Sequence, residues 1–96
     1  MSIFPVTTKK MRCQILKKLK DGKVWEKNEM LRHLAKLNKL TMSQYSRKDP
    51  KSGRNSWDQR VKWELTWLRK RELIKNVRLG HFKITRYGKS ALDLCT

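Results

Sequence analysis

Polar side chains that can hydrogen-bond phosphate groups or nucleobase edges recur at helical spacing between residues 57 and 71. At about 100° per residue, an α-helix gathers them on one arc that contains no apolar residue. Lysine and arginine can bind phosphate or guanine, glutamine can pair with adenine, and threonine can contact the thymine methyl group. An acidic residue in the first turn suits the helix dipole, so Asp58 is set apart from this role. The other members of the arc are Gln59, Lys62, Thr66, Arg69 and Lys70.

Two further basic groups flank this arc, one in the segment before it and one in a turn after it. Arginine is concentrated in the same half, because seven of the nine arginines lie at or beyond residue 47. The guanidinium group presents planar, bidentate donors to phosphate and guanine, which makes the C-terminal half the predicted binding side. The flanking residues are Arg47, Lys48, Lys51 and Arg54 before the arc, and Arg78, His81 and Lys83 after it.

The remaining reactive side chains lack the spacing that is typical of catalysis or metal binding. Cys13, His33, His81 and Cys95 stand singly, without a Cys-x-x-Cys or His-x-x-x-His pair that would indicate zinc. We recognise no nucleophile–base constellation and no glycine-rich phosphate loop. We therefore expect no enzyme activity, no cofactor and no metal. Two cysteines also make no disulfide framework, which favours a reducing compartment and a cytoplasmic protein.

The composition indicates one small folded domain that needs an anionic partner. The 96 residues have room for one core, and 38% of them are hydrophobic, which argues against disorder. The formal net charge is +17, from 25 Lys and Arg against 8 Asp and Glu. Such self-repulsion destabilises the compact state until a polyanion neutralises it, and nucleic acid is the polyanion that we expect. No apolar run approaches the roughly 18 residues of a membrane span.

We expect residues 1–7 to form an N-terminal arm and residues 8–96 to form the domain. Pro5 disfavours a helix before it. Residues 2–20 contain no acidic side chain, as in an organelle transit peptide. An arm followed by a core helix is the preferred interpretation, because removing this stretch would take away apolar residues that the fold needs.

Apolar spacing predicts four helices and a β-hairpin. A Thr41-x-x-Gln44 capping box indicates one further helical turn, and a Ser56-x-x-Gln59 box should open the longest helix. The predicted helices cover residues 8–21, 27–38 and 57–71, and a last helix is capped by Thr85. An extended segment covers residues 23–25, and an exposed loop covers residues 46–55. Two strands cover residues 73–78 and 81–85 and are joined by a turn at Leu79 and Gly80.

The order of these elements predicts an α+β fold: a winged helix-turn-helix with a three-helix core, a C-terminal β-hairpin wing and a final short helix. Glu64 falls on the core stripe of the third helix, where it needs a partner such as Arg60 or Arg71. Trp63 and Trp67 border that stripe. Stacking on single-stranded bases is one interpretation of the tryptophans, and packing against the first helix or the arm, which would bury these two, is the preferred one. The apolar residues predicted to form the core are Met11, Ile15, Leu16, Leu19, Met30, Leu34, Leu37, Trp57, Val61, Leu65, Leu68, Phe82 and Ile84, with Leu31 and Trp25 at its margin.

A further pattern extends over most of residues 10–93 and consists of Ile15-Leu16, Leu19-x-Asp21-Gly22, Asn55, Arg60-Val61-x-Trp63, Leu68-Arg69-Lys70, Leu73-Ile74 and Gly80-His81-Phe82-Lys83-Ile84-Thr85-x-x-Gly88. This pattern resembles the N-terminal winged-helix domain of Mrr-type restriction endonucleases. The resemblance implies recognition of DNA, including modified DNA, for a nuclease carried elsewhere, since the acidic and lysine motifs of the nuclease domain are absent here. Glu64 and Glu72 stand where that family usually has Ala and Gly, so a stand-alone phage or mobile-element regulator is equally compatible.

Double-stranded DNA is therefore the expected partner, with the third helix in the major groove and the loop and wing on the backbone. Two alternatives stay open: an RNA-binding basic protein, which would use its loop and arm because the A-form major groove excludes helices, and a protein-interaction winged helix. A nuclease or regulatory protein is a further expected partner. A homodimer would add specificity, and Ile3, Phe4 and Val6 are the apolar candidates for its interface.

Overall fold

The computed structural model describes Phe4 and residues 6–95 of the chain. Within this part, the predicted order of helices and strands is confirmed, and a short 3-10 helix, η1, extends the last helix. The elements are α1 (Thr8–Leu19), β1 (Trp25–Glu26), α2 (Lys27–Leu37), α3 (Met42–Ser46), α4 (Ser56–Lys70), β2 (Ile74–Arg78), β3 (His81–Ile84), α5 (Arg86–Ala91) and η1 (Leu92–Cys95).

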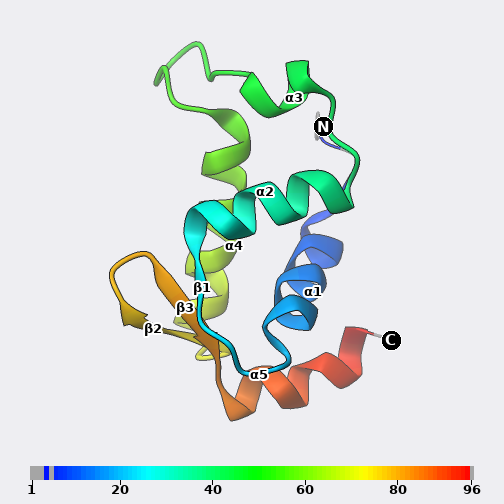
Figure 1. Ribbon diagram of the computed structural model, residues 1–96, viewed down its shortest axis with the longest axis vertical. Coiled ribbons are helices and arrows are strands. Elements are labelled where there is room, and N and C mark those ends of the chain that lie inside the picture. Colours follow the sequence, from blue (N-terminus) through cyan, green and yellow to red (C-terminus); the bar gives the residue numbers. More distant parts are fainter. Residues whose placement is uncertain (1–3, 5, 96) are drawn as a thin grey trace.

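Three helices and a small antiparallel sheet enclose one core, which is the predicted α+β, winged-helix-like fold (Figure 1). Helices α1, α2 and α4 all pack against one another. The sheet has the strand order β1-β3-β2, and β3 supplies the buried residues Phe82 and Ile84. Burying these side chains against the helices removes apolar surface from water, which is the main favourable term in folding. The hairpin therefore covers the side of the core that three helices leave open.

Helix starts follow the predicted capping chemistry with one correction. The side chains of Thr7, Thr41 and Thr85 each accept a hydrogen bond from a backbone N–H of the helix that follows. Ser56 is not the cap of α4, because the Asn55 side chain accepts from the Asp58 N–H at 2.9 Å. Asparagine and serine are about equally good caps, so local sequence did not separate two adjacent candidates.

The wing is a hairpin whose turn and base both depend on glycine. Gly80 has φ +75°, a conformation that glycine adopts at little cost, and this confirms the predicted turn. Ile74 pairs with Ile84 on the buried side, and a bulge interrupts the register between Asn76 and Arg78. At the base, a Cβ on Gly88 would overlap the carbonyl group of Leu73, so only glycine lets α5 approach β2 this closely.

Two predictions about apolar residues are wrong. Leu37 is 49% exposed, and Ala35 is the residue buried near the end of α2. Val6 is only 4% exposed, and the Phe4 ring lies 4.9 Å from the Trp57 ring, edge to face. These two side chains pack on their own domain and are not free to form a dimer interface. The third candidate, Ile3, lies outside the described residues.

The prediction that the cysteines make no disulfide is also wrong. Cys13 of α1 is bonded to Cys95 at the end of η1, with a Cα–Cα distance of 5.6 Å across 82 residues of sequence. Only the packing of η1 against α1 brings the two residues together, and no local spacing signals it. Nowhere in Phe4 and residues 6–95 is there a helix that is both long and apolar enough to cross a membrane.

Candidate nucleic-acid interface

A groove of about 640 Å³ runs between the outer face of α4 and the loop that precedes it. Five of the residues predicted from the sequence to contact DNA line it together. Its cationic and polar side chains stand beside two aromatic rings and one carboxylate. The lining residues are Asp49, Arg54, Gln59, Lys62, Trp63, Thr66, Trp67 and Lys70. We call this the α4 groove.

Buried contacts on the inner side of α4 fix the direction in which its outer face points. Trp57 is fully buried, and its indole Nε1 donates to the Leu31 carbonyl oxygen at 3.1 Å. Glu64 is 2% exposed, and its Oε1 lies 3.3 Å from the Arg12 Nε, which donates a hydrogen bond to it. Glu64 Oε2 lies 3.9 Å from an Arg60 nitrogen. The expected partner Arg60 is therefore confirmed, whereas Arg71 is not one, and Arg12 is a partner that sequence spacing missed.

The loop before α4 is held by hydrogen bonds rather than extending freely from the domain. Asn55 Nδ2 donates to the Tyr45 carbonyl oxygen at 2.7 Å, which links the loop to α3. Gln59 Nε2 donates to Ser52 Oγ at 3.1 Å, so the first turn of α4 contacts the loop directly. Asp49 accepts from the Lys51 N–H at 2.9 Å and from the Ser52 hydroxyl group at 3.3 Å. These bonds bring the exposed loop cations and the α4 face to one side.

Two tryptophans of α4 lie one helical turn apart but differ in their surroundings. Trp67 is partly buried, and the guanidinium groups of Arg12 and Arg71 lie 3.6 and 4.7 Å from its ring centre. Trp63 is 73% exposed, which contradicts the prediction that it is buried. Arg12 of α1 packs on the Trp67 ring, whereas no such contact with Trp63 occurs among the described residues, so the two border positions differ through tertiary contacts.

The other predicted site residues lie outside the α4 groove. Arg47, Lys48 and Lys51 are exposed on the loop, whose ends are joined by a bridge between Lys48 and Asn55. Arg69 lines a separate groove of about 540 Å³ with Lys75 and Arg86, two basic residues that the sequence reasoning missed.

The wing residues form a third group. Arg78 is exposed, and one of its guanidinium nitrogens lies 3.3 Å from His81 Nε2. Lys83 pairs with Lys75 across the two strands. Like charges directly opposite in a sheet repel each other, so a bound anion would relieve this pair.

The wing tip and the start of α4 meet at one residue, Lys27. Its backbone N–H donates to the Gly80 carbonyl oxygen at 2.8 Å, and its Nζ lies 3.2 Å from Asp58 Oδ1. The ion pair occupies Asp58, which agrees with setting this residue apart from the DNA-contacting ones. The same contacts place the wing tip beside the first turn of α4.

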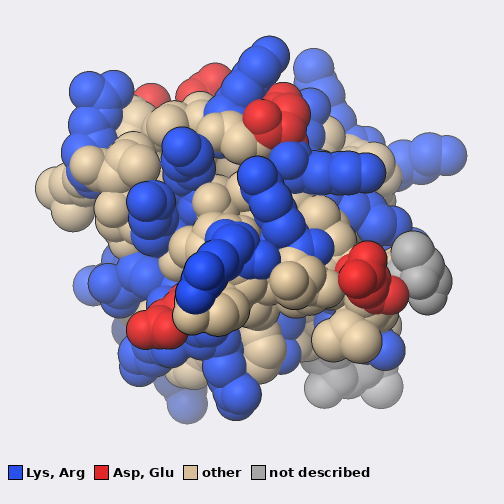
Figure 2. Space-filling view, turned by 90° about the horizontal axis from the view of Figure 1, so that it is seen from below, with Lys and Arg blue, Asp and Glu red and all other residues tan. Residues whose placement is uncertain are grey.

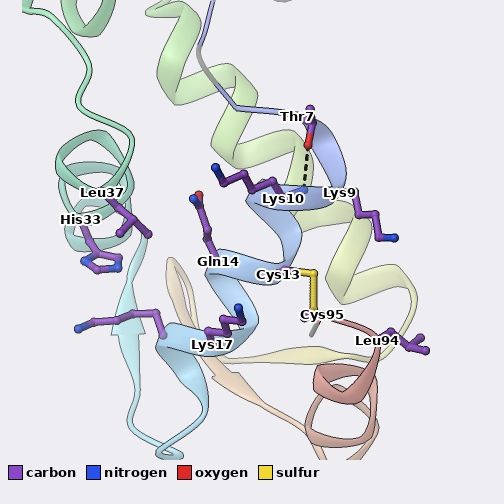
Figure 3. A pocket seen from close by; sticks show the side chains of 11 residues that line it. Thr7, Lys9, Lys10, Cys13, Gln14, Lys17, His33, Leu37, Leu94 and Cys95 are labelled. Atoms are coloured by element: carbon purple, nitrogen blue, oxygen red, sulfur yellow. Dashed lines mark hydrogen bonds between the residues drawn. A yellow bond between two sulfur atoms is a disulfide. The ribbon is translucent and has the colours of Figure 1, made fainter.

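A second basic groove, of about 680 Å³, lies on α1 (Figure 3). Lys9, Lys10 and Lys17 reach it from α1, and His33 and Leu37 reach it from α2 (Figure 3). The disulfide and Leu94 close its C-terminal side. We call this the α1 groove. The sequence reasoning assigned it no role, because its members come from three segments with no shared motif.

Basic side chains dominate the surface well beyond these grooves. Figure 2 shows one face on which Lys and Arg are spread widely and Asp and Glu form a few isolated groups. This spread agrees with the formal net charge of +17. Phosphate-rich ligands would therefore be attracted from several directions, and the location of the binding site must depend on the side chains of a particular groove. Among the described residues, no three His, Cys, Asp or Glu side chains gather as metal ligands.

Comparison with known proteins identifies one family. The family model described as the Mrr N-terminal domain matches residues 9–93, and this confirms the resemblance seen in the sequence. The matched model is an N-terminal domain and not a nuclease domain. No curated protein and no solved structure matches the chain.

Proposed function

The chain belongs to the Mrr N-terminal domain family, and we propose that it binds double-stranded DNA through α4, the loop before it and the wing. In this proposal α4 enters the major groove, where its outer side chains reach base edges and phosphates. The loop and wing cations contact the backbone on either side. This arrangement needs no catalytic group.

The observation that carries the proposal is the convergence of predicted DNA-contacting residues in the α4 groove. Arg54 comes from the loop, whereas Gln59, Lys62, Thr66 and Lys70 come from successive turns of α4. They combine cations, which bind phosphate or guanine, with an amide and a hydroxyl group, which read base edges. The only acidic member of the lining in the described part of the chain is Asp49. A surface with this composition suits a ligand that carries both phosphates and bases.

The biological setting that we propose follows from the family. The domain would serve as the recognition module of a restriction system, together with a nuclease partner, or as a small phage or mobile-element regulator. Dimerisation, through a surface other than Phe4 and Val6, would extend the recognised sequence. A cytoplasmic location stays a prediction, and in a reducing cytoplasm we expect the bond between Cys13 and Cys95 to be open.

A charge-matched pair of variants tests the proposal. Replacing Lys62, Thr66 and Lys70 together by Ala should lower the affinity for duplex DNA at least about tenfold, because two cations and a base contact are removed. Replacing Lys9 and Lys17 by Ala removes the same charge from α1 and should change the affinity no more than about twofold. Fluorescence anisotropy with a labelled duplex at several salt concentrations measures both.

The proposal fails if the two variants lose the same affinity, because the contact would then depend only on net charge. It also fails if the wild-type protein does not bind duplex DNA at low ionic strength. The affinity for duplex RNA at matched salt distinguishes DNA binding from the RNA-binding alternative, since a helix that reads a major groove should bind duplex DNA more tightly than duplex RNA. Melting temperatures of both variants control for folding and should stay close to the wild-type value, because all five side chains lie at the surface or only partly below it.

A further inference from the structure

The exposed ring of Trp63 is the least explained feature of the α4 groove. Tryptophan is a large apolar side chain, and this one is 73% exposed at the centre of a basic face. Its neighbour Trp67 is covered by the guanidinium groups of Arg12 and Arg71. Among the described residues, no ring stacking and no cation–π contact involves Trp63, although cations line the same groove. Most of its indole ring is therefore accessible to a planar ligand.

We propose that Trp63 stacks on an unpaired nucleobase of bound DNA and that the α4 groove holds that base. This inference rests on the proposed function and narrows it to DNA with a base outside the helical stack. In an intact duplex, each base face is covered by its neighbours, so a tryptophan ring can reach a face only after the base leaves the stack. Aromatic side chains bind such bases by stacking, and every base has a face for this.

The groove supplies the other contacts that an unpaired nucleotide requires. Arg54, Lys62 and Lys70 line the same groove as Trp63 and can neutralise the phosphates that flank the base. The hydroxyl group of Thr66 and the carboxylate of Asp49 can accept or exchange hydrogen bonds with the base edge. The groove volume of about 640 Å³ lies within the range of small-molecule sites, which is roughly 300–1,000 Å³. The groove therefore offers contacts for the phosphates, the base edge and the base face of one flipped or bulged nucleotide.

Charge argues against a second copy of this chain as the occupant. The groove is lined by three cations and one carboxylate, and the chain as a whole carries a formal net charge of +17. Two copies facing each other here would bring like charges together, which is costly at low salt. A DNA strand brings phosphates and base faces to the same place, so it satisfies the cations and the ring at once.

The test compares an intact duplex with the same duplex carrying one extra, unpaired base at its centre. The wild-type protein should bind the bulged duplex at least about fivefold more tightly, which is the lower end of measured base–aromatic stacking effects. Trp63→Ala and Trp63→Leu should lose this preference, so that the ratio of their affinities for the two duplexes falls to about one. Trp63→Phe should retain most of it, because its ring can still stack, whereas leucine offers only apolar surface.

Each result decides between the inference and its competitors. If wild-type protein binds both duplexes equally well, the inference is wrong and the proposed duplex binding stands. If Trp63→Leu keeps the preference, apolar burial explains it and stacking does not. If Trp63→Ala weakens both duplexes equally, the ring serves ordinary duplex contact and the inference is overturned. Failure to bind either duplex overturns both proposals. Quenching of tryptophan emission by the bulged duplex, absent in Trp63→Phe, gives an independent readout, and melting temperatures control for folding.

Discussion

The α4 groove and the α1 groove have similar volumes, about 640 and about 680 Å³, but different linings. The α4 groove adds to its cations an exposed indole ring, a threonine hydroxyl group and the amide of Gln59, which donates to Ser52 Oγ. The α1 groove adds a disulfide and two exposed leucines, Leu37 and Leu94. Its one amide, that of Gln14, is already paired with Asn38 by reciprocal hydrogen bonds of 3.0 and 2.9 Å.

This difference teaches that charge and shape do not by themselves define a nucleic-acid site. Cations in either groove attract phosphate, and this attraction carries no sequence information. Reading a base requires donors, acceptors or ring faces that the protein has not already used. In the α4 groove the exposed indole ring of Trp63 remains available for this, although the Gln59 amide donates to Ser52. In the α1 groove the imidazole of His33 is the aromatic group, and the Gln14 amide is bonded to Asn38. Substitutions that disturb one groove and spare the other test this contrast.

The largest effect is expected at Glu64, which connects the two helices that carry the grooves. Glu64→Ala removes the buried partner of Arg12 and Arg60 and should lower the free energy of unfolding by about 3 kcal/mol. Urea denaturation measures this loss. The control is Asp58→Ala, which breaks the more exposed pair with Lys27 and should cost less than about 1 kcal/mol. Equal losses would show that Glu64 does not hold the helices in register.

The next largest effect concerns the disulfide that borders the α1 groove. Cys95→Ser should lower the free energy of unfolding by roughly 2–4 kcal/mol, because the bond restricts the unfolded chain across a long loop. A reducing agent should destabilise the wild-type protein similarly and leave the variant unchanged. Since Cys95 does not line the α4 groove, we expect duplex affinity in the folded state to change less than about twofold. A parallel loss of DNA binding would mean that the two grooves are coupled.

Loop cations should influence the salt dependence of binding more than its selectivity. Replacing Arg47, Lys48 and Lys51 by Ala should weaken all duplex sequences alike and flatten the slope of log K against log salt by roughly two to three units. The matched control replaces Lys9, Lys10 and Lys17, which should leave the slope close to the wild-type value. If the control flattens the slope as much as the loop variant does, both grooves hold DNA and the contrast between them breaks down.

The smallest effect is expected from His33 at the edge of the α1 groove. Desolvation, and then the charge of Lys18, lower the pKa of this imidazole below its usual 6.5. The unfolded chain therefore binds the proton more readily, so stability is complete above about pH 6.5 and decreases as pH falls toward the folded-state pKa. His33→Gln should make urea midpoints less dependent on pH between about 7.5 and 5.5. An unchanged pH dependence would show that His33 contributes nothing to it.

Sequence patterns predicted the interior of α4 better than its borders. Trp57, Val61, Glu64, Leu65 and Leu68 are all buried, as helical periodicity indicated. Periodicity could not decide between Trp63 and Trp67, because both lie beside the stripe. Arg12 of α1 covers Trp67, whereas Trp63 is 73% exposed. The most informative residue of the candidate site was therefore expected to be buried.

What the sequence determined by itself are the local features: helix periodicity, the threonine caps, the Gly80 turn and the excess of basic charge. Each depends on residues within about one or two turns of one another, so the pattern and its physical cause lie in the same stretch. Tertiary structure alone decided which basic residues share a groove, that Cys13 meets Cys95, and that Trp63 faces solvent. These outcomes depend on how segments that are far apart in the chain pack together, and the local spacing of residues does not specify that packing.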